Sequence, residues 1–436
     1  MDDPINQGPG DVTVSHCNII STNGKQTKDF GPRVWNTIIL TESMGLLQGD
    51  PIFISGEITI VDAAGLFNEM NFSGDEKVEF RFKTPPKEEI EFIGKVYHIN
   101  VSDFDTKRSI TLKFVSAEKI LAEQVKFNRA YRDVLYSDMA QDIFSSLNPI
   151  SQKKIYAEPT KNKGSLIINN KSPVDALTMI AKVARSSSYM GANYVFFEQV
   201  GGVFQFVSIE SLVDPTKVDS SMIYFYGAVP KGIRSLDKLK QIKSYTVLSM
   251  PNIVSNVQRG MYAGTTVSND LIKRQIGYST FNYDESYDKY KSVNFNEVGS
   301  SGKTTLLTNK NYSQRNEGYV HFVPKHFKSF DTDTNHGDDR EESLLVRNSQ
   351  LQQINAIRLQ LVIAGDSQRK VGEVIEVVIP AVEKKTKKVG GRTDLAFSGR
   401  YLVTKVKHVV TSKSGGYETI MLLTKDSYAE PLPVKV

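Results

Sequence analysis

Residues 74–83, GDEKVEFRFK, begin the stretch that decides the fold. Val78, Phe80 and Phe82 alternate with charged residues, so the apolar side chains share one face of an extended chain and the charged ones share the other. Two prolines, Pro85 and Pro86, then end the run. The pattern predicts a half-buried β-strand that packs one face against a core.

This strand belongs to a series of elements that occurs twice. The first series runs EITIV (57–61), the strand above, Pro85, FIGK (92–95) leading VYHINV, and SITLKFVS (109–116). The second runs RLQLVIAG (358–365), GEVIEVVI (372–379), Pro380, FSGR (397–400) leading YLVTKVKHVV, and YETIMLLT (417–424). Short antiparallel strands at this spacing predict a small sandwich or barrel, and the repeat predicts two of them.

An alternative explanation of the repeat stays open. Any two four-stranded meanders look alike once gaps are allowed, although the shared Phe-x-Gly-Lys/Arg motif and the shared proline at a strand exit weigh against chance. A duplicated barrel has a consequence for assembly. Around a threefold axis, two similar domains per chain give a ring of six near-equivalent positions.

The chain between the two series contains helical patterns. Ser172 and Pro173 supply an N-cap and a first-turn proline for a helix predicted over 173–186. A second apolar stripe predicts a helix over 137–147, which Asn148-Pro149 ends. Gly201-Gly202 predicts the turn of a β-hairpin, since both residues tolerate the positive φ that such a turn needs. Residues 118–234 are therefore expected to form an α+β unit between β-rich flanks.

Composition describes an ordinary globular chain of two to four domains. Of 436 residues 39% are hydrophobic and 24% charged, and a net charge of +5 is too small to imply a nucleic-acid partner. The single cysteine, Cys17, excludes a disulfide framework within the chain. The acidic N-terminus does not have the pattern of a signal peptide, and no apolar run reaches the roughly 20 residues that span a bilayer, so we expect a soluble protein.

One motif imitates a nucleotide site. Residues 298–305, VGSSGKTT, end like a phosphate-binding loop, with Gly302-Lys303-Thr304 in place. The first glycine of that motif should lie at 297, where the chain has Glu297, whose carboxylate would repel a phosphate. Neither a buried strand before the loop nor a helix after it is evident. We therefore predict a connecting loop and no nucleotide cofactor.

Other chemical candidates are no stronger. Asp331 to Glu342 imitates a calcium-binding loop, but His336 stands where the sharp turn requires glycine. His321 and His326 are the only histidines close together, and a spacing of five on a strand puts them on opposite faces. No nucleophile motif or paired acids stand out. The sequence predicts no catalytic residue, no metal, no cofactor, and no binding residue that can be named.

Several stretches, taken in order, resemble the central baseplate hub proteins of contractile-tailed (T-even-like) bacteriophages. They are TES (41–43), SGEITIVD (55–62), GDEKVEF (74–80), GMYA (260–263), NDLI (269–272), VGEV (371–374), SGRYLV (398–403) and LTKDS (423–427). Each is a strand with its turn and none is chemically diagnostic alone. The resemblance spans nearly the whole chain.

The resemblance implies a structural virion protein that is not an enzyme. It implies a homotrimer whose six β-barrels form a pseudo-sixfold ring in the tail baseplate, assembled in the host cytoplasm without membrane insertion. The ring would join a hexameric tail tube or tube initiator to a trimeric cell-puncturing spike, beside other baseplate proteins, and leave a channel for DNA in transit. The expected fold is mainly β with α+β insertions.

The expected domains follow from the resemblance and the repeat together. They are a first tube barrel (1–117), the inserted α+β domain (118–234), a second tube barrel (235–275 and 341–428), an insertion in that barrel (276–340) and a C-terminal tail (429–436). Three other functions remain open: the hub of a bacterial contractile injection device, a carbohydrate or host-surface binding module on the same barrels, and an NTPase, which Glu297 disfavours.

Overall fold

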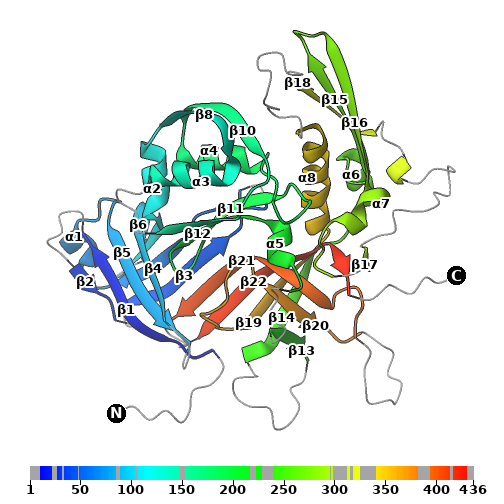
Figure 1. Ribbon diagram of the computed structural model, residues 1–436. Coiled ribbons are helices and arrows are strands. Elements are labelled where there is room, and N and C mark those ends of the chain that lie inside the picture. The colour runs from blue at the N-terminus through cyan, green and yellow to red at the C-terminus, as the bar shows by residue number, and fades with distance from the viewer. Residues whose placement is uncertain are drawn as a thin grey trace, which may run out of the picture.

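Two β-barrels lie side by side in the computed structural model of the chain (Figure 1), with an α+β unit above them and a small sheet projecting at the upper right. The structure describes residues 10–21, 27–31, 34–47, 49–84, 89–104, 107–147, 153–216, 222–227, 239–294, 296–297, 312–314, 318–324, 340–381, 393–412 and 416–429.

The first barrel is formed by β1 to β7, in the spatial order β2-β1-β5-β6-β7-β4-β3, and every neighbouring pair is antiparallel. Its elements are β1 (Thr13–Ile20), β2 (Thr27–Asp29), β3 (Trp35–Ser43), β4 (Ser55–Asp62), α1 (Leu66–Met70), β5 (Lys77–Lys83), β6 (Ile90–Phe104) and β7 (Lys107–Ser116). Val78, Phe80 and Phe82 on β5 are buried, as their alternation with charged residues predicts.

The second barrel is closed. Its elements are β13 (Ile223–Tyr226), β14 (Gln241–Ser249), β19 (Ile357–Ala364), β20 (Val374–Val378), β21 (Gly399–Thr411) and β22 (Tyr417–Lys425). The strands run β21-β20-β13-β14-β19-β22, and β22 pairs again with β21. β13 is parallel to both of its neighbours, whereas the other pairs are antiparallel.

The two barrels share one connectivity. The ladders β3–β4, β4–β7, β7–β6 and β6–β5 of the first correspond to β14–β19, β19–β22, β22–β21 and β21–β20 of the second. The N–H of Val96 donates to the carbonyl of Glu76 at 2.9 Å, as that of Val403 does to Glu373 at 2.8 Å. The predicted fold class, mainly β with two similar barrels, is confirmed.

The sequence motif used to align the repeats is out of register. The ladder β5–β6 places Gly94 opposite Val78, and β20–β21 places Tyr401 opposite Ile375. When the two barrels are matched by their ladders, Gly94 corresponds to Tyr401, so Gly399 of the second motif lies two positions earlier. The order of strands was therefore a sounder guide than the shared glycine.

The α+β unit packs two helices against short strands. Its elements are α2 (Ala117–Gln124), β8 (Phe127–Leu135), α3 (Tyr136–Ser145), β9 (Lys154–Ala157), β10 (Lys163–Lys171), α4 (Pro173–Ala181), β11 (Tyr194–Gln199), β12 (Val203–Ser208) and α5 (Ile209–Val213). The predicted hairpin and both predicted helices are present, although α4 ends at Ala181 and not at the predicted residue 186. The Ser172 hydroxyl accepts the N–H of Asp175 at 3.1 Å and caps α4.

The last group of elements interrupts the second barrel between β14 and β19. It contains α6 (Ile253–Gln258), β15 (Ala263–Asp270), β16 (Gln275–Asn282), α7 (Tyr283–Ser286), a 3-10 turn (Tyr287–Lys289), β17 (Asn296–Glu297), a second 3-10 turn (Tyr312–Gln314), β18 (Val320–Pro324) and α8 (Arg340–Ile354). β16, β15 and β18 form the projecting sheet, and β17 pairs with β23 (Ser427–Tyr428). None of the helices in the described ranges is both long and apolar enough to span a membrane.

The strand pairing refines the predicted domains. β13, placed by the sequence within 118–234, pairs with the second barrel, because its partners β14 and β20 offer it two parallel edges. β15, placed within the second barrel, instead pairs with β16 and β18 in a separate sheet. The domain boundaries themselves stay a prediction.

Candidate assembly site at the barrel junction

The two barrels are joined edge to edge. β3 of the first barrel pairs antiparallel with β21 of the second over seven residue pairs, from Ser43 opposite Lys405 to Thr37 opposite Thr411. This ladder, the barrel junction, merges both barrels into one continuous sheet. Backbone hydrogen bonds fix its register, so the two barrels cannot rotate independently about it.

Glu42 lies inside the junction without contact with solvent. Its carboxylate accepts hydrogen bonds from the backbone N–H of Val200 and, at 3.0 Å, from that of Val371. Burial raises the pKa of Glu42 to about 8, while the two N–H groups oppose the rise and the nearby Glu373 adds to it. A single buried carboxyl therefore connects the first barrel, the α+β hairpin and the second barrel.

The hairpin between β11 and β12 enters the junction from the α+β unit. Gly201 and Gly202 have φ values of 102° and 76°, which the tight turn requires and which side chains disfavour. Val200, just before them, is buried in the core of the first barrel. Gln199 donates through Nε2 to the carbonyl of Val371 at 2.9 Å. The turn thus contacts both barrels and holds them in one orientation.

A buried ion pair anchors β11 close to this turn. Lys153 donates through Nζ to Glu118 at 2.7 Å and to Glu198 at 2.6 Å. The second oxygen of Glu198 accepts the N–H of Ile54, in the first barrel, at 2.9 Å. Burial raises the pKa of Glu198, and Lys153 opposes the rise. Because each of these groups has a partner, removing one would leave a buried charge uncompensated.

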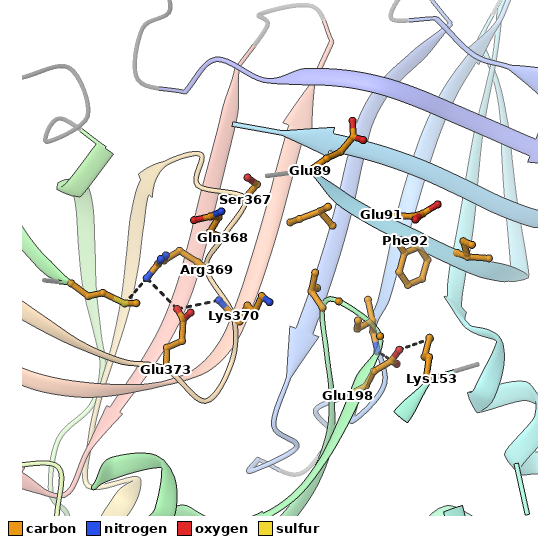
Figure 2. A pocket seen from close by; sticks show the side chains of 17 residues that line it. Glu89, Glu91, Phe92, Lys153, Glu198, Ser367, Gln368, Arg369, Lys370 and Glu373 are labelled. Atoms are coloured by element: carbon orange, nitrogen blue, oxygen red, sulfur yellow. Dashed lines mark hydrogen bonds and ion pairs between the residues drawn. The ribbon is translucent and has the colours of Figure 1, made fainter. Parts of the chain in front are cut away.

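A cavity of about 690 Å³ lies beside the junction. Figure 2 shows Glu89, Glu91 and Phe92 of the first barrel on one side and residues 367–373 of the second barrel on another, with Lys153 and Glu198 near the hairpin. Two of its basic side chains are paired: Lys153 as described above, and Arg369, which lies 3.3 Å from Asp366 and 3.2 Å from Glu373. Lys370 also lines the cavity, which lies between the two barrels and the hairpin.

Two residues that could carry chemistry, His408 and Cys17, lie buried in the core of the described part of the chain. No group of three or more His, Cys, Asp or Glu side chains there is arranged to hold a metal ion. His408 is fully buried, and burial lowers its pKa to about 4, while its Nδ1 lies 2.7 Å from the hydroxyl of Tyr417. Cys17 is buried, and burial raises the pKa of its thiol, so it is an unreactive core residue.

The loops that resemble phosphate-binding and calcium-binding motifs lie largely outside the described residues. These include Gly302, Lys303 and Thr304 of the phosphate-like loop and Asp331 to His336 of the calcium-like loop. Glu297 lies in β17, opposite Ser427 of β23. Of the histidine pair, His321 lies on β18, and His326 is outside the described residues.

The projecting sheet offers a second contact surface. Tyr278, Val267 and Phe322 stand in register across its three strands. Exposed apolar side chains on this sheet and its β15–β16 turn are Leu271, Ile272, Ile276, Tyr278, Val320 and Phe322, and Leu271 is 79% exposed. Exposed apolar side chains gathered on one small sheet are typical of a surface that binds another molecule.

The fold of this chain is similar to that of tail proteins of known structure. No protein-family model matches the chain, and no curated protein is similar to it in sequence. The chain is similar in structure to the 43 kDa tail protein of prophage MuSo2 from Shewanella oneidensis, with a TM-score of 0.55 and 8% identity over 95% of this chain and 99% of that one. It is also similar to a tail protein from Neisseria meningitidis, with a TM-score of 0.52 and 9% identity over 94% and 96% of the two chains.

Sequence reasoning gave none of the junction residues a role, although Glu42 and Val371 lie in stretches that carry the family resemblance. Glu42 is 158 residues from Val200 and 329 from Val371, so no local pattern reports their contact. The available signal was a lone carboxylate near the end of the apolar strand 35–43, WNTIILTES. A buried acid in such a strand needs fixed hydrogen-bond donors, but the sequence does not say which segments supply them.

Proposed function

We propose that this chain is a structural protein of a contractile phage tail, the central hub of the baseplate. Three copies would form a ring of six barrels that adapts the sixfold tail tube to the threefold cell-puncturing spike and leaves a channel for DNA. In this function the chain is not an enzyme and needs no cofactor. Its place is the tail baseplate of the virion.

The observation that carries the proposal is the duplicated barrel with a rigid junction. Two barrels of the same connectivity stand edge to edge in one sheet, and the α+β hairpin fixes their orientation through Glu42. A chain built of two near-equivalent units is what a threefold assembly needs to present six equivalent positions. The likeness in fold to two tail proteins, one of them from a prophage, agrees with this function.

Other tail proteins would bind outside the ring contacts. The projecting sheet, with Tyr278 and Phe322 more than 70% exposed, supplies an apolar surface for such a partner. The same architecture would also suit the hub of a bacterial contractile injection device. The two differ in the tube and spike that the ring joins and not in the ring itself.

Light scattering and electron microscopy test the proposal. Purified protein is expected to give particles of three times the chain mass, or of that mass plus the spike when the spike is co-expressed, and negative-stain images should show a threefold ring with a central hole. Incubation with ATP should give no phosphate release above a buffer control. A monomer at every concentration, with and without the spike, would refute the hub.

A further inference from the structure

Two strand edges lack a strand partner in the ranges the structure covers. The part of β6 from His98 to Phe104 pairs with β7 on one side only. The part of β14 from Ser244 to Ser249 pairs with β19 on one side only, because β13 reaches just the first two residues of β14. Such edges present unpaired N–H and C=O groups to any strand that fits them.

β6 is the counterpart of β21. Each strand has one register shift in the ladder that it makes with the next strand along the chain. In β6 the shift lies between Val96 and His98, and in β21 between Val403 and Lys405. When the strands are aligned on these shifts, Val101 corresponds to His408.

β14 is the counterpart of β3 by the same test. The ladder of β3 with β4 shifts between Trp35 and Thr37, and the ladder of β14 with β19 has its first shift between Ile242 and Ser244. A second shift of β14, between Val247 and Ser249, has no counterpart in β3 and lies beyond Val247. Counting three residues on from Thr37 and from Ser244 matches Leu40 with Val247. The two free edges thus belong to the counterparts of the two strands that meet in the barrel junction.

Side-chain burial differs between the barrel junction and the free edges of β6 and β14. In the junction, His408 stands opposite Leu40, and both are buried, at 0% and 1% exposure. Their counterparts Val101 and Val247 are 41% and 37% exposed. The chain therefore contains one complete contact between barrels, formed by β3 and β21. It also contains β6 and β14, the two strands that would form a second contact of the same kind, but these lie apart from each other.

We propose that β6 of one chain pairs antiparallel with β14 of a second copy of this chain, in the register of the barrel junction. Val101 then lies opposite Val247, and Asp103 lies opposite Tyr245, as His408 and Val410 lie opposite Leu40 and Ile38. The inference rests on the proposed ring and assigns the surface that closes it. Three such pairs alternate with three barrel junctions, and this head-to-tail contact closes after three chains.

Apolar side chains flank the proposed contact. Tyr97 is 54% exposed at the register shift of β6, and Leu248 and Met250 are each 44% exposed at the end of β14. Tyrosine and methionine are enriched in protein interfaces, where their burial adds to the backbone hydrogen bonds. A second copy of the chain would cover these groups together with the free edge.

Paired cysteines test the register. A Val101→Cys, Val247→Cys double variant is expected to give disulfide-linked dimers and trimers on mild oxidation, because directly opposed residues bring their Cβ atoms within about 5 Å. Each single variant should stay monomeric on a denaturing gel, and the native Cys17 is buried. A Ser102→Cys, Val247→Cys variant is the matched control, since a shift of one residue puts the thiols on opposite faces.

The outcomes separate this inference from the proposed function. Cross-linking of the 101/247 pair alone, with rings in micrographs, supports the contact. Rings whose 101/247 thiols stay reduced would overturn this interface and leave the hub intact, whereas a monomer in every condition would overturn both. As a second measurement, Val247→Lys should raise the concentration at which trimers form by about tenfold or more, and leave the Tm of the dilute chain unchanged.

Discussion

The barrel junction is formed by β21 and β3, and the free edges belong to β6 and β14, the corresponding strands of the opposite barrels. In the junction the polar groups are sealed in, with Glu42 between two N–H donors and His408 beside Tyr417. At the free edges the corresponding positions hold the exposed Met250 and Val101. The difference teaches that the same strand geometry is buried within one chain where an α+β hairpin packs against it, and is left exposed where that hairpin is missing.

The largest effect is expected at Gly56. A Cβ added there would lie 2.0 Å from the carbonyl oxygen of Ile39 and 2.6 Å from the ring of Phe114. The corresponding position of the second barrel holds Leu359, fully buried opposite Leu423. Gly56→Leu should therefore lower the free energy of unfolding by about 3 kcal/mol or more, because the strand itself must shift. Chemical denaturation measures it.

The second barrel suggests a matched control for this variant. Phe114 of the first barrel corresponds to Leu423, so Gly56→Leu, Phe114→Leu gives the first barrel the pair that the second already uses. The double variant should recover part of the lost stability. If the single and double variants lose the same free energy of unfolding, the phenyl ring of Phe114 is not the obstacle, and the backbones of the two barrels differ at this position.

Loss of Glu42 should weaken the junction next most. Glu42→Ala leaves the buried N–H groups of Val200 and Val371 without an acceptor, at a cost of about 2–4 kcal/mol. Glu42→Gln keeps one acceptor oxygen and should cost about half as much. Thermal unfolding compares the two, and a Gln variant less stable than the Ala variant would show that the hydrogen bonds are not what Glu42 supplies.

The pH dependence of the Glu42→Gln variant isolates the carboxyl. The pKa of Glu42 is raised to about 8, above the ordinary value of about 4.3. Between these pH values the folded chain holds a proton that the unfolded chain has lost, so the stability of the wild type should fall as pH rises through this window. The difference in Tm between the wild type and the Gln variant should follow that fall. A difference independent of pH would contradict the buried, protonated carboxyl.

The sequence predicted the local elements better than the contacts between them. The alternation in β5, the Ser172 cap of α4 and the Gly201-Gly202 turn are written in neighbouring residues, and each was found. Residues 223–226, IYFY, fall within the predicted α+β unit but form β13 of the second barrel, and this short strand joins parallel neighbours without a turn to signal it. The contacts of the junction residues could not be predicted because their partners lie more than 150 positions away.

A smaller effect, of opposite sign, is expected at Lys425. Its ammonium is buried above the ring of Tyr401 and donates to the carbonyl of Ser398 at 2.8 Å, and burial lowers its pKa to about 7. The first barrel has the small Ser116 at this position. Lys425→Met should stabilise the chain by about 1–2 kcal/mol at pH 6, because an apolar side chain of similar length avoids burying a charge.

The gain from Lys425→Met should shrink at alkaline pH. The unfolded lysine keeps its proton to about pH 10.4, whereas the folded one releases it near 7. The wild type therefore gains stability as pH rises between these values, and the variant does not. Tm values at pH 6 and pH 9.5 measure this. A constant difference would mean that Lys425 stays charged in the fold.

The smallest effect, in the isolated chain, is expected at Val101. Val101→Thr changes a side chain that is 41% exposed and should alter the free energy of unfolding by less than about 0.5 kcal/mol. His408→Thr, at the corresponding position of the second barrel, removes a fully buried ring and its contact with Tyr417, and should cost several times more. Unfolding in dilute solution compares the pair. Equal losses would mean that β6 is packed within its own chain, and an edge already occupied there cannot receive a strand from a second copy.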